Sequence, residues 1–390
     1  MKYMGHKGKL LQNGLSEVLL EHSRNAEKIA DPFCGSAAVS WFLAQKTNKA
    51  IISGDIQTYA VIRARAVVER IETFNPDDVI KNWFRKTKRV IEKISNFFPN
   101  GFSSFSPDLS DISKIQKAVK QSRSFCSDVL PFLFDKTKGI WPITKAYGGH
   151  YFSPNQALIF DALRRTIPAE VGVKEVALAS LVEAASLAVA SPGHTAQPFQ
   201  PTKSASPYIA EAWMRDPFLL TENAFKEIAQ LSAQAIGRGV VGDFSKTISH
   251  LKAGDMVFAD PPYSGVHYSR FYHVLETIVR GIEFAPEGKG RYPAIEDRPS
   301  SAFSMKSVSF DAAKKLLETC KRKKVTLVLT FPTDDASNGL SSQNFKELGK
   351  SLFGNIKEEI IDSDFSTLGG NKKHREARQT RKESIITFLP

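Results

Sequence analysis

The segment EKIADPFCGSAAVSWFLAQKTNKAIISGD, residues 27–55, decides the fold class of this chain. Its first residues predict a short strand that ends at Asp31, and the apolar run at 37–44 predicts a helix. Residues 50–55 predict a second buried strand with an acid, Asp55, at its carboxyl end. A strand, a glycine-containing turn, a helix, a second strand and an acid are together typical of a βαβ unit that binds nucleotides.

Strand and helix patterns occur again in the C-terminal part of the chain. Strand patterns occupy residues 255–260, 324–331 and 383–388. A helical pattern at 309–321 precedes the second of these strands. Together with the first segment they predict an α/β fold.

An insertion separates the two groups of strands. From about residue 76 the chain has helical segments and loops rich in Ser, Pro and Gly, and strand patterns return only after residue 236. We therefore expect a catalytic domain made of residues 1–75 and 237–390, interrupted by an inserted region at 76–236. The apolar run 176–190 is shorter than the ~20 residues that span a bilayer, so it predicts a buried helix.

The composition is that of a globular protein with excess positive charge. Of 390 residues, 42% are apolar and 24% are charged, which argues against a disordered chain. The net charge of +12 favours a polyanionic partner, nucleic acid before an anionic membrane. Cys34, Cys126 and Cys320 lie far apart, which excludes a disulfide framework and the common cysteine-based zinc signatures. We expect no metal, no signal peptide and a cytoplasmic location.

The strongest chemical signal is Asp260-Pro261-Pro262-Tyr263, at the end of an apolar strand. Two prolines cannot continue a central strand, so the chain must leave the sheet at its carboxyl end, where open α/β folds bind ligands. There the Asp260 carboxylate and the Pro261 carbonyl can accept hydrogen bonds from an exocyclic NH2 group. The Tyr263 ring can lie against the ring that bears it. The alternative is a stiff turn with an incidental acid.

A second motif, Asp31-Pro32-Phe33-Cys34-Gly35-Ser36, ends the first strand and precedes a helix. Its glycine and backbone N–H groups permit close approach of a ligand. The two motifs in this order resemble those of the DNA-adenine methyltransferases of the Dam-like D12 class (α-group). The resemblance implies a Rossmann-like S-adenosylmethionine-dependent methyltransferase fold, with a mostly parallel seven-stranded sheet and an inserted target-recognition region. It also implies methyl transfer from S-adenosylmethionine to adenine N6.

The resemblance extends to the two ends of the chain and assigns roles to residues. Residues 2–11, KYMGHKGKLL, are similar to the family's N-terminal K-W-x-G-G-K motif, and 381–388 resemble its last strand. The catalytic residues it implies are Asp260, Pro261, Pro262 and Tyr263. The cofactor-binding residues it implies are Tyr3 and Lys7 beside the methionine moiety, Asp31, Pro32, Phe33 and Gly35 in the turn, Asp55 and Ile56 at the ribose, and Asp243 and Phe244 near the adenine. Ala37 replaces a common second glycine, and we expect it to be tolerated.

Contacts with DNA are expected from two loops. The segment 191–201 offers His194, Thr195 and Gln197, whose side chains can contact bases or phosphates. An ordinary surface loop is the alternative there. We expect Lys372 and Lys373, in a basic run before the last strand, to contact phosphates.

These observations predict site-specific N6-adenine methylation of double-stranded DNA with base flipping, in a restriction–modification or phage-defence system. The alternatives are methylation of cytosine N4 or of adenine N6 in RNA, and a catalytically idle DNA-binding protein on the same fold. A cognate restriction endonuclease or defence protein would be a partner, with no membrane involved. The protein would be bacterial, archaeal or phage-encoded, and would act as a monomer or dimer in association with the nucleoid.

Overall fold

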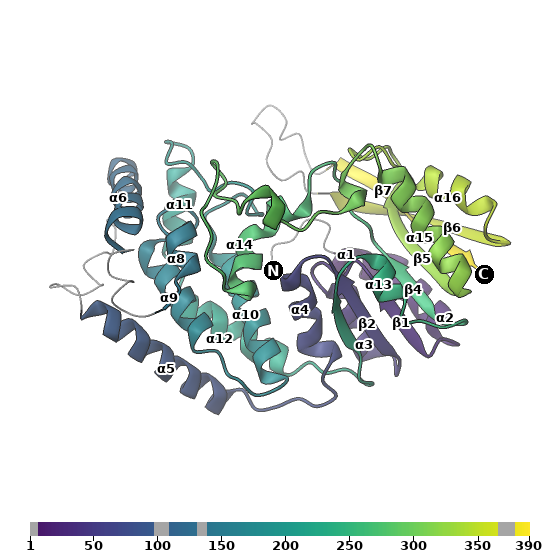
Figure 1. Ribbon diagram of the computed structural model, residues 1–390, viewed down its shortest axis with the longest axis horizontal. Coiled ribbons are helices and arrows are strands. Elements are labelled where there is room, and N and C mark those ends of the chain that lie inside the picture. The colour runs from purple at the N-terminus through teal and green to yellow at the C-terminus, as the bar shows by residue number, and fades with distance from the viewer. Residues whose placement is uncertain (1–6, 97–108, 131–138, 366–378) are drawn as a thin grey trace. The chain divides into compact units, whose positions relative to one another are not determined.

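The chain forms two compact units, which Figure 1 draws as ribbons. The structure, a computed structural model, describes residues 7–96, 109–130, 139–365 and 379–390. The sheet unit comprises the described residues of 3–73, 231–269 and 299–390. The helical unit comprises those of 74–230 and 270–298. The helical unit therefore includes a segment beyond the range 76–236.

The sheet has seven strands. They are β1 (Lys28–Asp31), β2 (Ala50–Asp55), β3 (Arg238–Val241), β4 (Met256–Ala259), β5 (Thr326–Pro332), β6 (Asn355–Phe365) and β7 (Gln379–Leu389). Their order is β3-β2-β1-β4-β5-β7-β6. The first five are parallel to their neighbours, and β7 is antiparallel to both β5 and β6. The prediction of a mostly parallel seven-stranded sheet is confirmed.

Helices cover both faces of this sheet. They are α1 (Gly8–Leu10), η1 (Leu11–Leu15), α2 (Ser16–Ser23), α3 (Ala38–Lys46), α4 (Thr58–Val68), α13 (Phe244–Ile248), η6 (Ala302–Ser304), α15 (Ser309–Lys323) and α16 (Ser342–Lys350). On one face α13, α15 and α16 enclose an apolar core with side chains such as Ile52, Val257 and Leu327. The alternate residues Ile51 and Phe258 are buried on the other face, where α2, α3 and α4 contact the strands.

The strand order creates a switch point between β1 and β4. From β1 the chain continues outward through β2 to β3, whereas β4 and β5 lie on the opposite side of β1. At such a point the connections diverge and leave a crevice at the carboxyl ends of the strands, where open α/β sheets bind ligands. Asp31 ends β1, Asp55 ends β2 and Asp260 follows β4 directly, so their carboxylates face one edge of the sheet.

The helical unit is built around a buried helix, as the sequence predicts. Its elements are α5 (Asp77–Ser95), α6 (Ile112–Ser124), η3 (Phe125–Val129), α8 (Pro142–Tyr147), α9 (Pro154–Arg165), α10 (Val173–Ala188), α11 (Ser206–Trp213), α12 (Pro217–Ala229), α14 (Tyr268–Arg280, whose first two residues belong to the sheet unit) and η5 (Ile295–Asp297). Helix α10 contacts α9, α11 and α12, and most of its side chains are buried. Among the described residues, no helix combines the length and apolar character needed to span a membrane.

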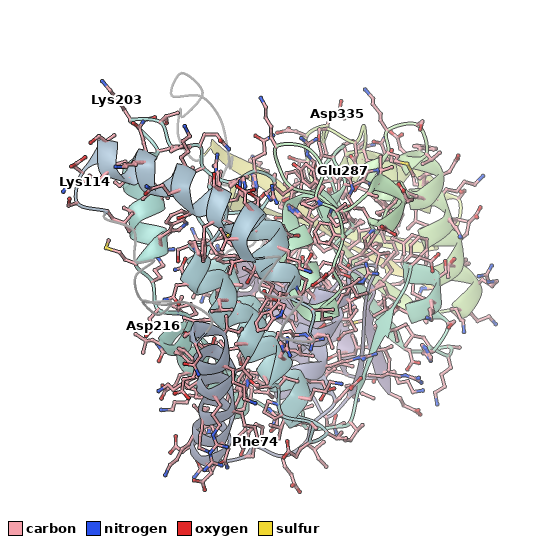
Figure 2. The ribbon with its side chains drawn as sticks, turned by 60° about the vertical axis from the view of Figure 1, so that its left-hand side comes forward. Phe74, Lys114, Lys203, Asp216, Glu287 and Asp335 are labelled. Carbon is pink, nitrogen blue, oxygen red and sulfur yellow. The ribbon has the colours of Figure 1, made fainter. Side chains whose placement is uncertain are left out.

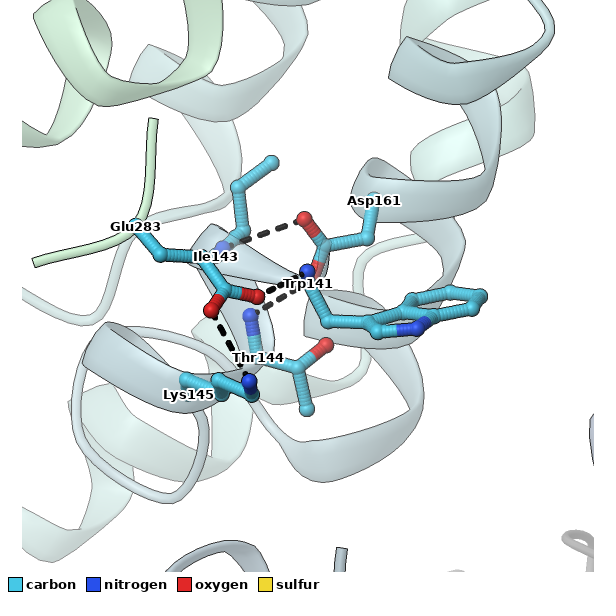
Figure 3. Close-up of polar contacts among 6 residues, drawn as sticks. All are labelled: Trp141, Ile143, Thr144, Lys145, Asp161 and Glu283. Atoms are coloured by element: carbon cyan, nitrogen blue, oxygen red, sulfur yellow. Dashed lines mark hydrogen bonds and ion pairs between the residues drawn. The ribbon is translucent and has the colours of Figure 1, made fainter. Parts of the chain in front are cut away.

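Two carboxylates hold the start of α8, as Figure 3 shows. Asp161 on α9 accepts hydrogen bonds from the backbone N–H groups of Ile143 (3.0 Å) and Thr144 (2.7 Å). Glu283 accepts one from Trp141 N (2.6 Å) and pairs with Lys145 Nζ at 2.9 Å. These acceptors satisfy N–H groups that a helix start leaves without partners. Burial raises the pKa of Asp161 to about 7, although these hydrogen bonds oppose the shift.

Basic side chains extend outward at one end of the helical unit. Helices α6 and α11 contact each other, and Figure 2 shows Lys114 of α6 and Lys203 near α11 at the end where these helices lie. Both side chains are exposed. Phe74, at the other end of the unit in Figure 2, packs edge-on against Phe225 of α12.

The cofactor turn predicted around Gly35 ends in a strained residue. Ala37, the residue before α3, has φ +64° and ψ +11°, in the left-handed region. A non-glycine residue costs about 1–2 kcal/mol there. Ala37 is also fully buried, and its methyl group contributes about 0.8 kcal/mol of apolar burial. The strain and the burial therefore largely offset each other.

We expect Ala37→Gly to change the free energy of unfolding by less than about 1 kcal/mol, because relief of strain offsets lost burial and a more flexible unfolded chain. Ala37→Val should lower it by at least about 2 kcal/mol, since a β-branched residue strongly disfavours positive φ. Urea unfolding of the three proteins measures both effects. Equal stability of the valine variant would contradict the left-handed conformation.

Candidate active site

A cavity of about 340 Å³ lies at the carboxyl ends of the central strands, entirely within the sheet unit. Among its lining residues are all the sequence-predicted catalytic residues. With the exception of Tyr3, which lies outside the described residues, the predicted cofactor residues line it too. These are Lys7, Asp31, Pro32, Phe33, Gly35, Asp55, Ile56, Asp243, Phe244, Asp260, Pro261, Pro262 and Tyr263. The structure therefore brings Lys7, the turn after β1 and the Asp260–Tyr263 motif into one site.

Asp31 is a buried carboxylate with unused hydrogen-bonding capacity. Its Oδ2 accepts a hydrogen bond from Ser40 Oγ at 2.6 Å, and Ser53 donates to Ser40 in turn. Its Oδ1 is buried and has no partner among the described residues. Burial raises the pKa of Asp31 to about 7, and the nearby Asp260 and Asp55 carboxylates add to the shift. Such an oxygen suits a cationic hydrogen-bond donor.

The turn after Asp31 is held by its backbone and by Asp55. Gly35 has φ +48° and donates its N–H to Asp55 Oδ2 at 3.1 Å. The other oxygen of Asp55 accepts from Gln57 N at 2.9 Å. A carboxylate has about four lone-pair positions, so Asp55 can accept further bonds from a diol while it holds the turn.

Aromatic rings line one end of the cavity. Phe33 packs edge-on against Phe303 at 5.4 Å between ring centroids and lies 6.0 Å from Phe244. Asp243 caps α13 by accepting from Lys246 N at 3.1 Å, and its side chain is exposed. Apolar rings beside an exposed carboxylate suit a planar heterocycle that bears an amino group.

Asp260 is held through one of its two oxygens. Oδ1 lies 3.0 Å from Lys7 Nζ and accepts a hydrogen bond from Thr330 Oγ1 at 2.9 Å. Burial raises the pKa of Asp260 to about 6, with Lys7 opposing and Glu383 adding to the shift. Near neutral pH the group is therefore ionised but more basic than an ordinary aspartate. The turn beyond it is fixed by Asn338, whose amide donates to Pro262 O at 3.0 Å.

Several residues that line the cavity or contact its lining residues are not predicted by the sequence motifs. Tyr268 is buried and hydrogen-bonds Tyr263, and its pKa is raised above the ordinary value, chiefly by burial. Thr330 and Glu383 reach the site from β5 and β7. Phe303 and Lys315 also line the cavity. The sequence signal for Glu383 is an acidic residue at the start of the otherwise apolar strand pattern 383–388.

The residues predicted to contact DNA differ in accessibility. In the helical unit, His194 and Thr195 are buried, and Thr195 donates to Phe271 O through both N and Oγ1, each at 2.7 Å. Gln197 is exposed. Tyr151 and Tyr292 donate their hydroxyls to carbonyls of this loop. The loop backbone is thus fixed and presents Gln197 to solvent. Lys372 and Lys373 lie outside the described residues.

The strand order, with only β7 reversed, and the cavity at the switch point define an α/β enzyme of the S-adenosylmethionine-dependent methyltransferase fold. The model of the D12 class N6 adenine-specific DNA methyltransferase family matches residues 3–134 and 144–330. The chain belongs to this family, which confirms the resemblance. It is therefore an adenine-specific DNA methyltransferase that uses S-adenosylmethionine. The family match supports this activity over methylation of cytosine N4, methylation of RNA and a catalytically idle fold. Comparison with curated proteins finds no match.

The cavity residues fit S-adenosylmethionine. The unpartnered Asp31 Oδ1 suits its ammonium group, the Asp55 carboxylate suits its ribose hydroxyls, and the rings around Phe33 suit its adenine. When bound, this cofactor supplies a methyl group activated by a sulfonium. Among the described residues no group of three or more His, Cys, Asp or Glu side chains is placed to hold a metal ion.

Asp31→Asn should stabilise the cofactor-free protein at pH 8 and weaken cofactor binding. The folded pKa of about 7 exceeds the unfolded value of about 3.9, so stability falls as pH rises between them and the cost is complete above pH 7. Asparagine lacks this cost, and we expect at least about 1 kcal/mol of gain at pH 8 and little at pH 4. Thermal unfolding at both pH values measures it.

Calorimetry with S-adenosylmethionine should show at least a tenfold loss of affinity in the same variant, because a charged acceptor is lost. A stability difference that does not depend on pH would contradict the buried ionisation. Unchanged affinity would remove Asp31 from the cofactor site.

Proposed function

We propose that the protein methylates adenine N6 at specific sites in double-stranded DNA, and that Asp260, Pro261 and Tyr263 hold the target base outside the helix. The observation that supports this most directly is the placement of Asp260. Its Oδ1 is occupied by Lys7 and Thr330, and it lines the same cavity as the cofactor turn. An acceptor of fixed orientation thus lies beside the expected position of the methyl donor.

The proposed role of Asp260 follows from the chemistry of an aromatic amine. The N6 lone pair is delocalised into the adenine ring, so the nitrogen is a weak nucleophile. Hydrogen bonds from its two N–H groups to the Asp260 carboxylate and the Pro261 carbonyl favour a pyramidal nitrogen and stabilise the positive charge that develops on it. Such preorganised acceptors stabilise the transition state more than the ground state.

Base flipping follows from where the reacting atom lies. Adenine N6 takes part in the base pair inside the duplex, and the Asp260 carboxylate is only 18% exposed. The two can meet only if the base leaves the stack. Tyr263 is half-buried, packs edge-on against Phe331 and is hydrogen-bonded to Tyr268, so its ring is fixed in the cavity wall. A fixed aromatic ring suits stacking with an extruded base.

Asp260→Asn should lower the rate of methyl transfer at least about a hundredfold, as does removal of one preorganised charged group from a transition state. Its S-adenosylmethionine affinity should change less than threefold. In the wild type, the rate should fall as pH drops through about 6, because protonated Asp260 loses acceptor capacity. Tritium transfer to unmethylated, PCR-amplified genomic DNA measures both effects. Near wild-type transfer by the variant would remove Asp260 from the mechanism.

We propose that sequence recognition uses the helical unit, and that Gln197 contacts a base edge. Hydrogen bonds of Thr195, Tyr151 and Tyr292 anchor the loop. The backbone from which the exposed side chain of Gln197 extends is therefore fixed. An amide can form two hydrogen bonds to adenine in the major groove. His194 and Thr195 then support the loop, and phosphate contacts by Lys372 and Lys373 stay a prediction.

Gln197→Ala should relax sequence preference at one position of the site, at a cost of about 1–3 kcal/mol for the preferred base. Lys203→Ala, on the same unit, is the matched control and should leave the preferred sequence unchanged. Single-molecule sequencing of a methylated random duplex library reports modified base and sequence together. An unchanged preference in the glutamine variant would assign recognition to other residues.

The biological setting is also a proposal. A site-specific adenine methyltransferase can protect host DNA from a cognate endonuclease in restriction–modification or phage defence. Methylation of most copies of one short sequence in the source genome would support protection, whereas sparse methylation would oppose it.

A further inference from the structure

Glu383 joins the two ends of the chain at the catalytic centre. It lies on β7 and is almost fully buried. Its Oε1 is 2.5 Å from Lys7 Nζ, and the same nitrogen is 3.0 Å from Asp260 Oδ1. One buried ammonium thus binds two carboxylates, one at the site of methyl transfer and one behind it.

We propose that Glu383 is a positioning residue for methyl transfer, which fixes Lys7 against one oxygen of Asp260 and keeps the Asp260 carboxylate a strong acceptor. This proposal rests on the role of Asp260 proposed above. Glu383 itself acts through Lys7 and does not touch the target base.

The geometry supports the orienting part of this role. The ammonium of a lysine is a compact charge on a flexible stem, so a single carboxylate partner fixes it poorly. Glu383 supplies the second partner from a strand paired with β5, which carries Thr330. Lys7 and Thr330 therefore both reach Asp260 Oδ1, which leaves Oδ2 to face an incoming amine.

The charges support the second part. If all three groups are ionised, the cluster carries one net negative charge in a buried place, where charges interact strongly. Besides Lys7, the charged or titratable groups that interact with Asp260 include Glu383, Asp31 and Tyr268. Burial and the Glu383 charge raise the pKa of Asp260, and Lys7 lowers it. Without the Glu383 charge, the ammonium of Lys7 would pair with Asp260 only. Its positive charge would then make the Asp260 carboxylate a weaker hydrogen-bond acceptor.

The alternative is that the ion pair between Lys7 and Glu383 is only structural. It would then hold the N-terminal segment against β7 without affecting the reaction. Glu383→Gln distinguishes the two roles, because it keeps the shape and an oxygen for Lys7 but removes the charge. Glu359→Gln is the matched control, since Glu359 is an exposed residue on the adjacent strand β6. Two measurements apply to each protein. One is the titration of the Asp260 13Cγ resonance, assigned by its loss in Asp260→Asn, and the other is the pH profile of methyl transfer to PCR-amplified genomic DNA.

In Glu383→Gln we expect the Asp260 titration and the acidic limb of the rate profile to move down by about one pH unit. The maximal rate should fall about threefold or more, because a less basic carboxylate is a weaker acceptor. S-adenosylmethionine affinity should stay within twofold, and Glu359→Gln should resemble the wild type. An unmoved Asp260 titration would overturn the proposal, and so would weaker cofactor binding with an unmoved acidic limb.

If Glu383→Gln does not fold, Glu383→Asp serves instead, because it keeps the charge but withdraws it from Lys7. We then expect a slower maximal rate with unchanged cofactor affinity, and a wild-type rate would overturn the proposal. Failure of the proposed function has a different signature. Asp260→Asn would then transfer methyl groups at a near wild-type rate, while the titration of Asp260 would still decide whether Glu383 controls it.

Discussion

The burial of carboxylates at the ends of neighbouring parallel strands is the constraint on which the site depends. Parallel pairing aligns the carboxyl ends of β2, β1 and β4, so Asp55, Asp31 and Asp260 must converge. A different set of hydrogen-bond or ionic partners compensates the burial of each carboxylate. Backbone N–H groups bind Asp55, a hydroxyl chain supports one oxygen of Asp31, and an ammonium and a hydroxyl bind Asp260. In the proposed function, each carboxylate serves a different part of the reaction.

The sequence predicts those parts of the fold that are coded locally. The strand 50–55 and the start of the helix at Ser309 are observed where they are expected, because their hydrophobic patterns and ends are distinct. The residue patterns did not predict β3 or β6. β3 is a four-residue edge strand that contains a glycine, and β6 is an edge strand whose charged residues protect it from aggregation and mask its pattern. Their presence in a seven-stranded sheet was predicted by resemblance alone.

The residues of the candidate site also fall into two groups, those that the sequence predicts and those that it does not. Asp31, Asp55 and Asp260 reach the cavity because each ends or directly follows a strand that the sequence pattern predicts. This rule does not find Tyr268, which lines the cavity, or Glu383 and Thr330, which contact Lys7 and Asp260, because tertiary pairing brings them there. The same limit applies to the loop 191–201. Its composition suggested three contact residues, but the hydrogen bonds of Thr195 to α14 make that residue an anchor and leave Gln197 exposed.

The cofactor turn shows why the site cannot also be the most stable part of the fold. In the proposed site, Asp31 Oδ1 would accept from the ammonium group of the ligand, and among the described residues this buried oxygen has no other partner. Close backbone approach needs a tight turn, so Ala37 has to adopt a left-handed conformation. The strain at Ala37 is largely offset by burial of its methyl group, and the cost at Asp31 is compensated by the packing of the surrounding sheet and its core. A cofactor that satisfies Asp31 lowers one of these costs, so its binding and the stability of the sheet unit are thermodynamically linked.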